Sequence, residues 1–140
     1  MIELGAGTAT STARPSAYFA RWLDHATWSE WSPDTEWVRI EEPVIVGSRG
    51  SMKPKGGPTV RFQVKALRPD AEYTDTTSFP GARLDFQHTA AEVDGVTHLE
   101  VNVTMTGVLA SVWAKVVGGR FATSVQQDLD RLVALVEARP

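Results

Sequence analysis

The strongest constraint on the fold of this chain is a long amphipathic segment near its C-terminal end, which follows several segments of alternating polarity. Between residues 109 and 136 apolar side chains recur at the three- and four-residue spacing that lines one side of a helix. They are Leu109, Val112, Trp113, Val116, Val117, Phe121, Val125, Leu129, Leu132, Val133 and Val136. Such a helix is about 40 Å long and must bury its apolar side. We therefore expect a sheet that curls around one long helix.

Length and composition fit one globular domain over residues 1–140. The chain has no cysteine, which excludes disulfides, thiolate metal sites and a cysteine nucleophile. No stretch approaches the ~18 apolar residues of a membrane span, and no basic segment followed by a hydrophobic one opens the chain. We therefore expect no transmembrane segment and a cytoplasmic location.

The charge balance argues against a nucleic-acid partner. The formal net charge is −3, from 14 basic and 17 acidic residues. Basic residues are scattered, apart from a modest cluster at Arg49, Lys53 and Lys55. A nucleic-acid-binding domain normally shows a basic patch or stripe and a basic balance.

The first half of the chain predicts strands at 2–12, 36–40, 47–53 and 60–66, because these segments are rich in β-formers or alternate in polarity. Two short helices are expected between the first two strands. The first, 16–23, follows Pro15, whose ring is pre-set for a first helical turn. The second, 24–31, starts at Asp24, a plausible cap, and ends at Ser32-Pro33-Asp34.

Turn chemistry predicts the register of the last three strands. Asp94-Gly95 is a strong signal for a two-residue hairpin turn. Centring the turn there pairs apolar residues with one another on one face and polar residues on the other. The expected pairs are Ala90 with Leu99, His88 with Val101, Phe86 with Val103, Leu84 with Met105, Gln87 with Asn102 and Thr89 with Glu100.

The preceding turn, Pro80-Gly81, places polar side chains on the apolar inner face. A two-residue turn there pairs Thr77 with Leu84, Asp75 with Phe86 and Tyr73 with His88. Tyr73, Asp75 and His88 then project inward, whereas His98 falls on the outer face.

Taken in order along the whole chain, the motifs resemble those of the START-like helix-grip (SRPBCC) superfamily, and most of all its polyketide cyclase/dehydrase-like branch. The matching pieces are Trp22-Leu23-Asp24 to Trp28, Trp31-Ser32-Pro33, Val46-Gly47-Ser48-Arg49-Gly50, Phe79-Pro80-Gly81, Leu84-Asp85-Phe86-Gln87-His88, Gly107-Val108-Leu109 and Gly118-Gly119. The resemblance implies an α+β fold. A curved antiparallel sheet of about seven strands would wrap around the C-terminal helix, with two short helices after the first strand.

The resemblance also implies a cavity between sheet and C-terminal helix that binds a hydrophobic or aromatic small molecule, such as a lipid, polyketide or isoprenoid. It does not imply catalysis, because one fold hosts many chemistries. The alternatives are a cyclase or dehydratase of polyketide-like substrates and a module that holds a protein partner. Partner binding predicts an exposed apolar patch and a filled core. The sequence leaves the ligand and the oligomeric state open.

The inner polar cluster supports two interpretations. In an enzyme, His88 is the general base, Asp75 orients it and Tyr73 polarises a carbonyl, so that the trio abstracts a proton or expels water. In a binding protein, His88 finds a hydrogen-bond partner and orients the ligand, because buried polar groups must be satisfied in either case. The remaining candidate ligand contacts are Trp28, Trp31, Phe62, Phe86, Val101, Trp113 and Val117.

Other sequence features are weaker. The tryptophans at 22, 28 and 31 either pack the short helices onto the sheet or line the cavity. Gly118-Gly119 predicts either a bend that makes room for a ligand or tight packing against a bulky residue such as Trp37. The histidines lack metal-ligand spacing and no phosphate loop or nucleophile elbow is present, so we expect neither metal nor cofactor.

Overall fold

The computed structural model describes residues 1–138. Its strands are β1 (Ile2–Ser11), β2 (Thr35–Ile40), β3 (Arg49–Pro54), β4 (Val60–Arg68), β5 (Glu72–Phe79), β6 (Ala82–Val93) and β7 (Val96–Thr106). Its helices are α1 (Pro15–Leu23), α2 (Ala110–Val117) and α3 (Phe121–Glu137), with the 3-10 turns η1 (His25–Glu30) and η2 (Gly118–Arg120). The two short helices after the first strand are thus present, the second as a 3-10 helix.

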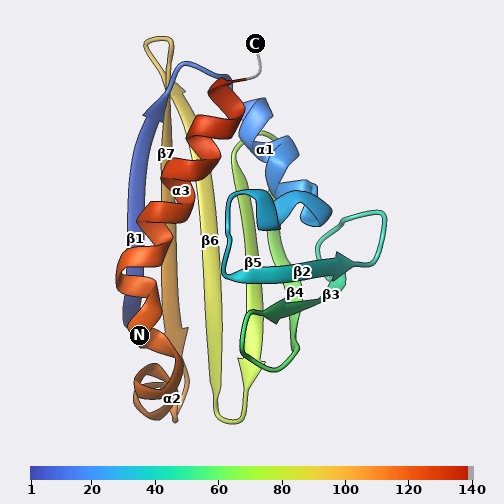
Figure 1. The fold of residues 1–140 in the computed structure, drawn as a ribbon, viewed down its shortest axis with the longest axis vertical. Helices are drawn as coiled ribbons and strands as arrows, with labels where there is room; N and C mark the ends of the chain where they lie inside the picture. Colours follow the sequence, from blue (N-terminus) through green and yellow to red (C-terminus); the bar gives the residue numbers. More distant parts are fainter. Residues whose placement is uncertain (139–140) are drawn as a thin grey trace.

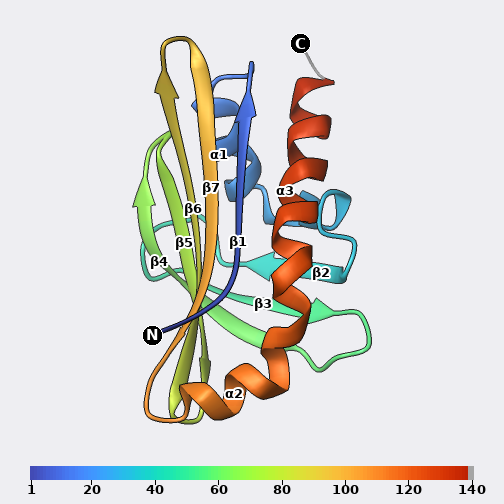
Figure 2. The same cartoon turned by 90° about the vertical axis from the view of Figure 1, so that its left-hand side faces the viewer.

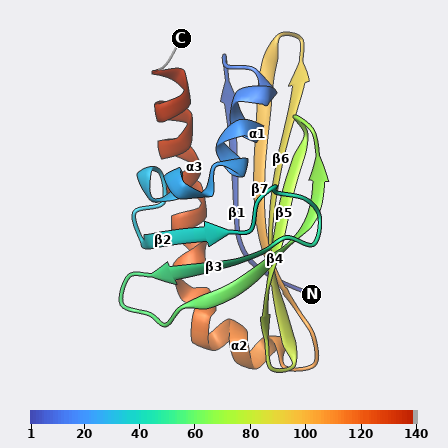
Figure 3. The same ribbon diagram turned by 90° about the vertical axis from the view of Figure 1, so that its right-hand side faces the viewer.

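The seven strands form one antiparallel sheet in the order β1-β7-β6-β5-β4-β3-β2. The sheet is strongly curled, so that β2 and β3 run across the direction of β5 to β7 (Figure 1). The same turn of the sheet is visible from the side of β4, where β2 and β3 reach across toward α3 (Figure 3). The α+β helix-grip fold that the sequence predicted is therefore confirmed.

Both predicted hairpin registers are confirmed. The β6–β7 pairs include Ala90 with Leu99 and His88 with Val101, and the β5–β6 pairs include Asp75 with Phe86 and Tyr73 with His88. Asp94 and Gly95 both have positive φ, 54° and 80°, as a type I′ hairpin turn requires. The local turn residues are thus sufficient to predict which side chains of these hairpins point to the inner face.

The C-terminal amphipathic segment is two helices and not one. It breaks at η2, where α2 turns away from the axis of α3 (Figure 2). A Cβ on Gly118 would lie 2.9 Å from a methyl of Leu4, whereas nothing lies within 4 Å of a Cβ on Gly119. The close neighbour of the glycine pair is therefore Leu4, at the bulge of β1, and not Trp37.

Helix α3 packs mainly on β1, at the edge of the sheet, and less on β7. A Cβ on Gly5 would overlap the carbonyl oxygen of Phe121, so glycine is what allows this close approach. The side chain of Gln126 makes two hydrogen bonds with the backbone of Thr8, of 3.0 and 2.9 Å. The helix thus covers the edge strand and leaves the inner face of β4 to β6 to other elements.

The upper part of the inner face is covered by α1, which contacts β5 and β6, while η1 packs on β2. Trp22 and Tyr18 from α1 are completely buried, and Trp28 and Trp31 are buried as well. The three tryptophans therefore pack the short helices onto the sheet. No helix within residues 1–138 is long and apolar enough to cross a membrane.

Candidate functional site

Three polar side chains from β5 and β6 project onto the inner face, as the register predicted. Alternation along β5 directs Tyr73 and Asp75 inward, and His88 lies opposite Tyr73 on β6. A fourth, His25, enters from η1, the element packed over this part of the sheet. All four are nearly inaccessible, with exposures between 0 and 6%.

These groups form a hydrogen-bonded chain with Tyr73 at its centre. The Tyr73 hydroxyl lies 2.9 Å from Oδ2 of Asp75 and 2.8 Å from Nε2 of His25. The other ring nitrogen of His25, Nδ1, lies 3.2 Å from the carbonyl oxygen of Leu23. A phenol, a carboxyl and an imidazole are therefore linked in a line that ends on a backbone acceptor.

The chain is fully satisfied only when it holds one proton beyond an ionised carboxyl and a neutral imidazole. Two arrangements meet this condition. In the first, His25 is a cation that donates from both ring nitrogens, and Tyr73 donates to the Asp75 carboxylate. In the second, Asp75 is protonated and donates to Tyr73, whose hydroxyl then donates to Nε2 of a neutral His25. Burial raises the pKa of Asp75 to about 7 and lowers that of His25. Both directions favour the uncharged arrangement, as expected away from water.

His88 is held separately from this chain. Its Nδ1 lies 3.1 Å from the backbone oxygen of Tyr73 and donates to it, which leaves Nε2 as a lone-pair acceptor. Burial lowers the pKa of His88 to about 4, so the ring is neutral at pH 7. We expected Asp75 to orient His88, but the structure pairs each of them with Tyr73 instead. The Asp75 carboxyl is hydrogen-bonded to the Tyr73 hydroxyl, and the His88 ring is hydrogen-bonded to the Tyr73 backbone oxygen.

Replacing Asp75 by asparagine is expected to change how stability depends on pH. The pKa of Asp75 is about 7 in the folded protein and about 3.9 when unfolded, so the folded state binds the extra proton and wild-type stability falls as pH rises between these values. His88 has the opposite effect between about pH 4 and 6.5, because its pKa is lowered on folding. Relative to wild type, Asp75→Asn should therefore gain up to about 1.4 kcal/mol per pH unit between pH 4.5 and 6.5.

Urea unfolding of both proteins at several pH values measures the difference between their free energies of unfolding. The contributions of the other titrating groups are common to both proteins and largely cancel in this difference. The control is Asp130→Asn on the exposed side of α3, which should run parallel to wild type. A constant difference between Asp75→Asn and wild type over this range would show that the carboxyl titrates normally.

An aromatic cluster surrounds the hydrogen-bonded chain. The Trp28 ring stacks on His25 at 4.5 Å between centroids and meets Tyr73 edge-on at 5.6 Å. Phe62 lies on the same side, 5.9 Å from His25, and Trp22 lies 5.4 Å from His88. This packing fills the upper interior and keeps water from the polar groups.

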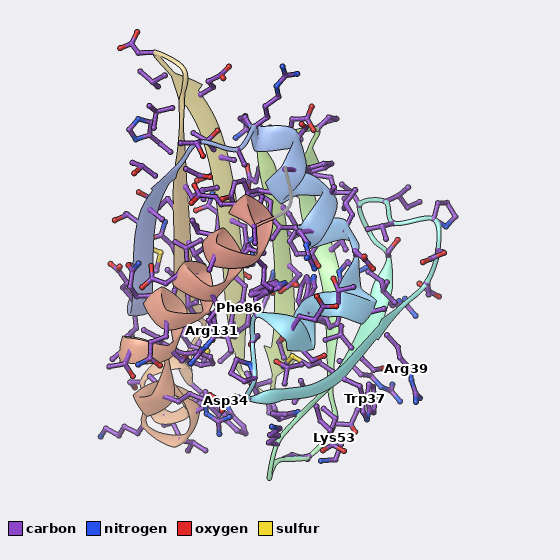
Figure 4. The ribbon with its side chains drawn as sticks, turned by 45° about the horizontal axis from the view of Figure 1, so that its top comes forward. Asp34, Trp37, Arg39, Lys53, Phe86 and Arg131 are labelled. Carbon is purple, nitrogen blue, oxygen red and sulfur yellow. The ribbon has the colours of Figure 1, made fainter. Side chains whose placement is uncertain are left out.

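The lower part of the inner face is apolar and only partly covered. We call it the open apolar face: Met52, Phe79, Phe86, Trp113, Val117 and Phe121, all of which pack against the core while staying partly exposed. Phe86 meets Phe121 edge-on at 5.6 Å, and Phe79 stacks on Trp113 at 4.8 Å. Phe86 lies between the sheet and α3 in the side-chain view (Figure 4), and in the β5–β6 register it is the direct neighbour of Asp75.

The structure separates the predicted site residues into two groups. Trp28, Trp31, Phe62, Tyr73, Asp75, His88 and Val101 are buried in the packed upper interior. Phe86, Trp113 and Val117 lie on the open apolar face. The two groups meet where Asp75 pairs with Phe86.

His25 is the member of the chain that sequence reasoning missed. It lies 48 positions from Tyr73, and no spacing rule links the two. The available signal was its place between the cap candidate Asp24 and Trp28 in a segment expected to lie over the sheet. Within residues 1–138 no group of three or more acidic or histidine side chains is arranged to hold a metal ion.

Comparison with solved structures shows how widely this architecture is shared. A hypothetical protein of Helicobacter pylori, jhp0584, matches with a TM-score of 0.73 and 15% identity, over 94% of this chain and 86% of the other. Ara h 8.0201 matches with a TM-score of 0.67 and 17% identity, over 96% and 97%. The di-domain ARO/CYC StfQ of the steffimycin biosynthetic pathway matches with a TM-score of 0.70 and 15% identity, over 96% of this chain and 50% of its own length.

No protein-family model and no curated protein sequence matches the chain. The structural likenesses, all at low identity, show that the chain has the helix-grip fold implied by the resemblance in sequence. The ligand and the chemistry have to be argued from the residues of this chain.

Proposed function

We propose that this protein binds a hydrophobic or aromatic small molecule on the open apolar face, with the Asp75 carboxyl as the polar group at the inner end of the site. The observation that carries the proposal is the contrast between the two halves of the inner face. The upper half is closed by aromatic packing, whereas the lower half keeps three phenylalanines and a tryptophan partly exposed. Contiguous partly exposed apolar side chains on a concave face are typical of a ligand site.

The polar end of the site favours a ligand with a hydrogen-bonding group. Asp75 is the neighbour of Phe86 across the β5–β6 ladder, and its carboxyl is uncharged below about pH 7. In the uncharged arrangement the proton of Asp75 is donated to Tyr73, so the other carboxyl oxygen remains as an acceptor and suits a hydroxyl at the end of an otherwise apolar molecule. Ligands of this kind include phenols and hydroxylated lipids.

Catalysis is the second candidate, and the observation that favours it is the raised pKa of Asp75, to about 7. A carboxyl that titrates near neutral pH suits general acid–base catalysis, whereas His88, with a pKa of about 4, is a weak base at pH 7. If the protein is a cyclase or dehydratase, we therefore assign the acid–base role to Asp75, with Tyr73 relaying its proton, instead of to His88. Uptake of deuterium from heavy water into a bound carbonyl ligand, lost in Asp75→Asn, would identify this activity.

A protein partner is the third possibility, and α2 is where it would bind. Val108, Val112 and Val116 are 92, 53 and 67% exposed along residues 108–117, which we call the α2 segment. The same segment carries Trp113 and Val117 of the open apolar face. Its exposed residues thus belong to the same segment as two residues of the proposed site.

Native mass spectrometry of protein purified from its own host separates these possibilities. We expect a near-stoichiometric hydrophobic compound to accompany the protein, which extraction would then identify. A bare mass in repeated preparations, together with a stable complex with another polypeptide, would replace ligand binding by partner binding. A bare mass with no partner would leave a transiently occupied enzyme.

A further inference from the structure

The outer face of the sheet carries a second feature, unrelated to the inner face. A hollow of about 750 Å³ lies over β2 to β5, on the side away from the core. Its lining includes Arg39, Arg49, Arg61, Ser51, Thr76 and Ser78. We call it the arginine hollow.

The register explains why three arginines gather there. On the outer face, Arg39 of β2, Ser51 of β3 and Arg61 of β4 lie side by side, with Ser51 in the middle. Adjacent strands are about 4.8 Å apart, so the two arginine backbones are about 10 Å apart. Arg49 lies two residues before Ser51 on the same face. Three arginine side chains thus start from positions next to Ser51 on the same face.

These guanidinium groups are not neutralised by carboxylates. Within residues 1–138 none of the three takes part in an ion pair, whereas the nearby Lys53 and Lys65 are paired with Glu36 and Asp85. Arg49 and Lys53, two of the basic residues that cluster in the sequence, thus have different surroundings. Arg49 lines the hollow, whereas Lys53 forms an ion pair with Glu36.

Two details indicate that the hollow is prepared for a ligand. The Arg39 guanidinium stacks over the Trp37 ring at 4.3 Å, which limits its motion. The hydroxyl oxygen of Thr76 is buried in the lining and has no hydrogen-bond partner, and neither has Oδ1 of Asp85, its neighbour across the β5–β6 ladder. Trp37, Arg39 and Lys53 gather along one side of the β2–β3 arm, away from α3 (Figure 4).

We propose that the arginine hollow binds a small anion with more than one phosphate group, of which inorganic diphosphate is the simplest. Guanidinium groups donate in pairs to phosphate oxygens, and three of them with the serine and threonine hydroxyls match the many acceptors of a diphosphate. A long polyanion such as a nucleic acid fits less well, because Glu41 lies in the lining and Asp85 is the neighbour of Thr76 across the β5–β6 ladder. Glu41, whose carboxylate accepts the backbone N–H of Arg49 at 2.8 Å, lowers the formal charge of the lining from +3 to +2.

Calorimetric titration with inorganic diphosphate tests the proposal. We expect saturable binding that weakens with added salt, and tenfold weaker binding of inorganic monophosphate, by an order-of-magnitude estimate from the lost contacts. Arg61→Gln and Arg39→Gln should each lower the affinity for diphosphate about tenfold. The matched control, Arg120→Gln in η2, loses the same charge outside the hollow and should bind as wild type does.

Absence of saturable binding at low ionic strength would overturn the proposal, as would an equal loss in the Arg120→Gln control. Equal affinity for monophosphate and diphosphate would overturn the assignment of several phosphate groups. Because all substituted side chains are exposed, amide spectra of the variants should show an intact fold. Backbone amides of Ser51 and Thr76 should shift on titration, which locates the bound anion.

Discussion

Removing the Tyr73 hydroxyl is expected to cost about 3 kcal/mol of folding free energy, although phenylalanine retains the ring. Tyr73 is completely buried, and its hydroxyl contacts both Asp75 and His25. In Tyr73→Phe both buried groups lose their shared partner, and an unsatisfied buried polar group costs more than the hydrogen bond was worth. Chemical unfolding at pH 7 measures the loss.

The only other tyrosine in the chain provides the control. Tyr18 is equally buried, but its hydroxyl donates to Ser11, which also contacts Glu137 near the surface. Tyr18→Phe therefore leaves no buried group without a partner and should cost about 1 kcal/mol. Similar losses in the two variants would show that the Asp75–Tyr73–His25 chain contributes no more than an ordinary hydrogen bond.

Placing a charge on the open apolar face should abolish binding of an apolar ligand. Phe86 is only partly buried, so Phe86→Arg is expected to fold, with the long side chain reaching water. Its guanidinium would lie where an aromatic ligand is proposed to stack. A bound ligand would have to displace the water around this guanidinium, and removing water from an unpaired charge costs several kcal/mol. The affinity for the uncharged fluorescent probe N-phenylnaphthylamine should therefore fall by about 100-fold or more.

Two further variants make this result specific. Gln87→Arg adds the same charge one residue away on the outer face and should leave the affinity for the probe unchanged. Phe86→Leu keeps an apolar side chain and should retain most of the affinity. If Phe86→Arg binds the probe as wild type does, the ligand site lies elsewhere.

The parts of the fold that local chemistry determines could be predicted from the sequence. Asp94-Gly95 defined the β6–β7 register, and with it the inward direction of His88 and Phe86, because a type I′ turn permits one pairing. The apolar periodicity of the C-terminal segment predicted its helical character. Its break into α2 and α3 could only be suspected from Gly118-Gly119, since the residue that lies close to Gly118 there is Leu4, from the other end of the chain.

The part of the site that lies on the inner face of the sheet could be predicted from the sequence. Tyr73, Asp75 and His88 were correctly placed together, but their hydrogen bonds were not, because His25 comes from a 3-10 turn whose position depends on tertiary packing. The position of α3 over β1 could not be predicted from the sequence either. It depends on the close approach that Gly5 permits, and it decides which apolar side chains stay partly exposed.

The most direct test of the central claim is to locate a bound apolar molecule by NMR. With the methyl groups of the protein labelled, intermolecular nuclear Overhauser effects report which side chains lie beside N-phenylnaphthylamine. The account predicts contacts with Met52 and Val117 of the open apolar face. Contacts confined to Val108 and Val112 on the exposed side of the α2 segment, or saturable binding with no contact to the inner face, would contradict it.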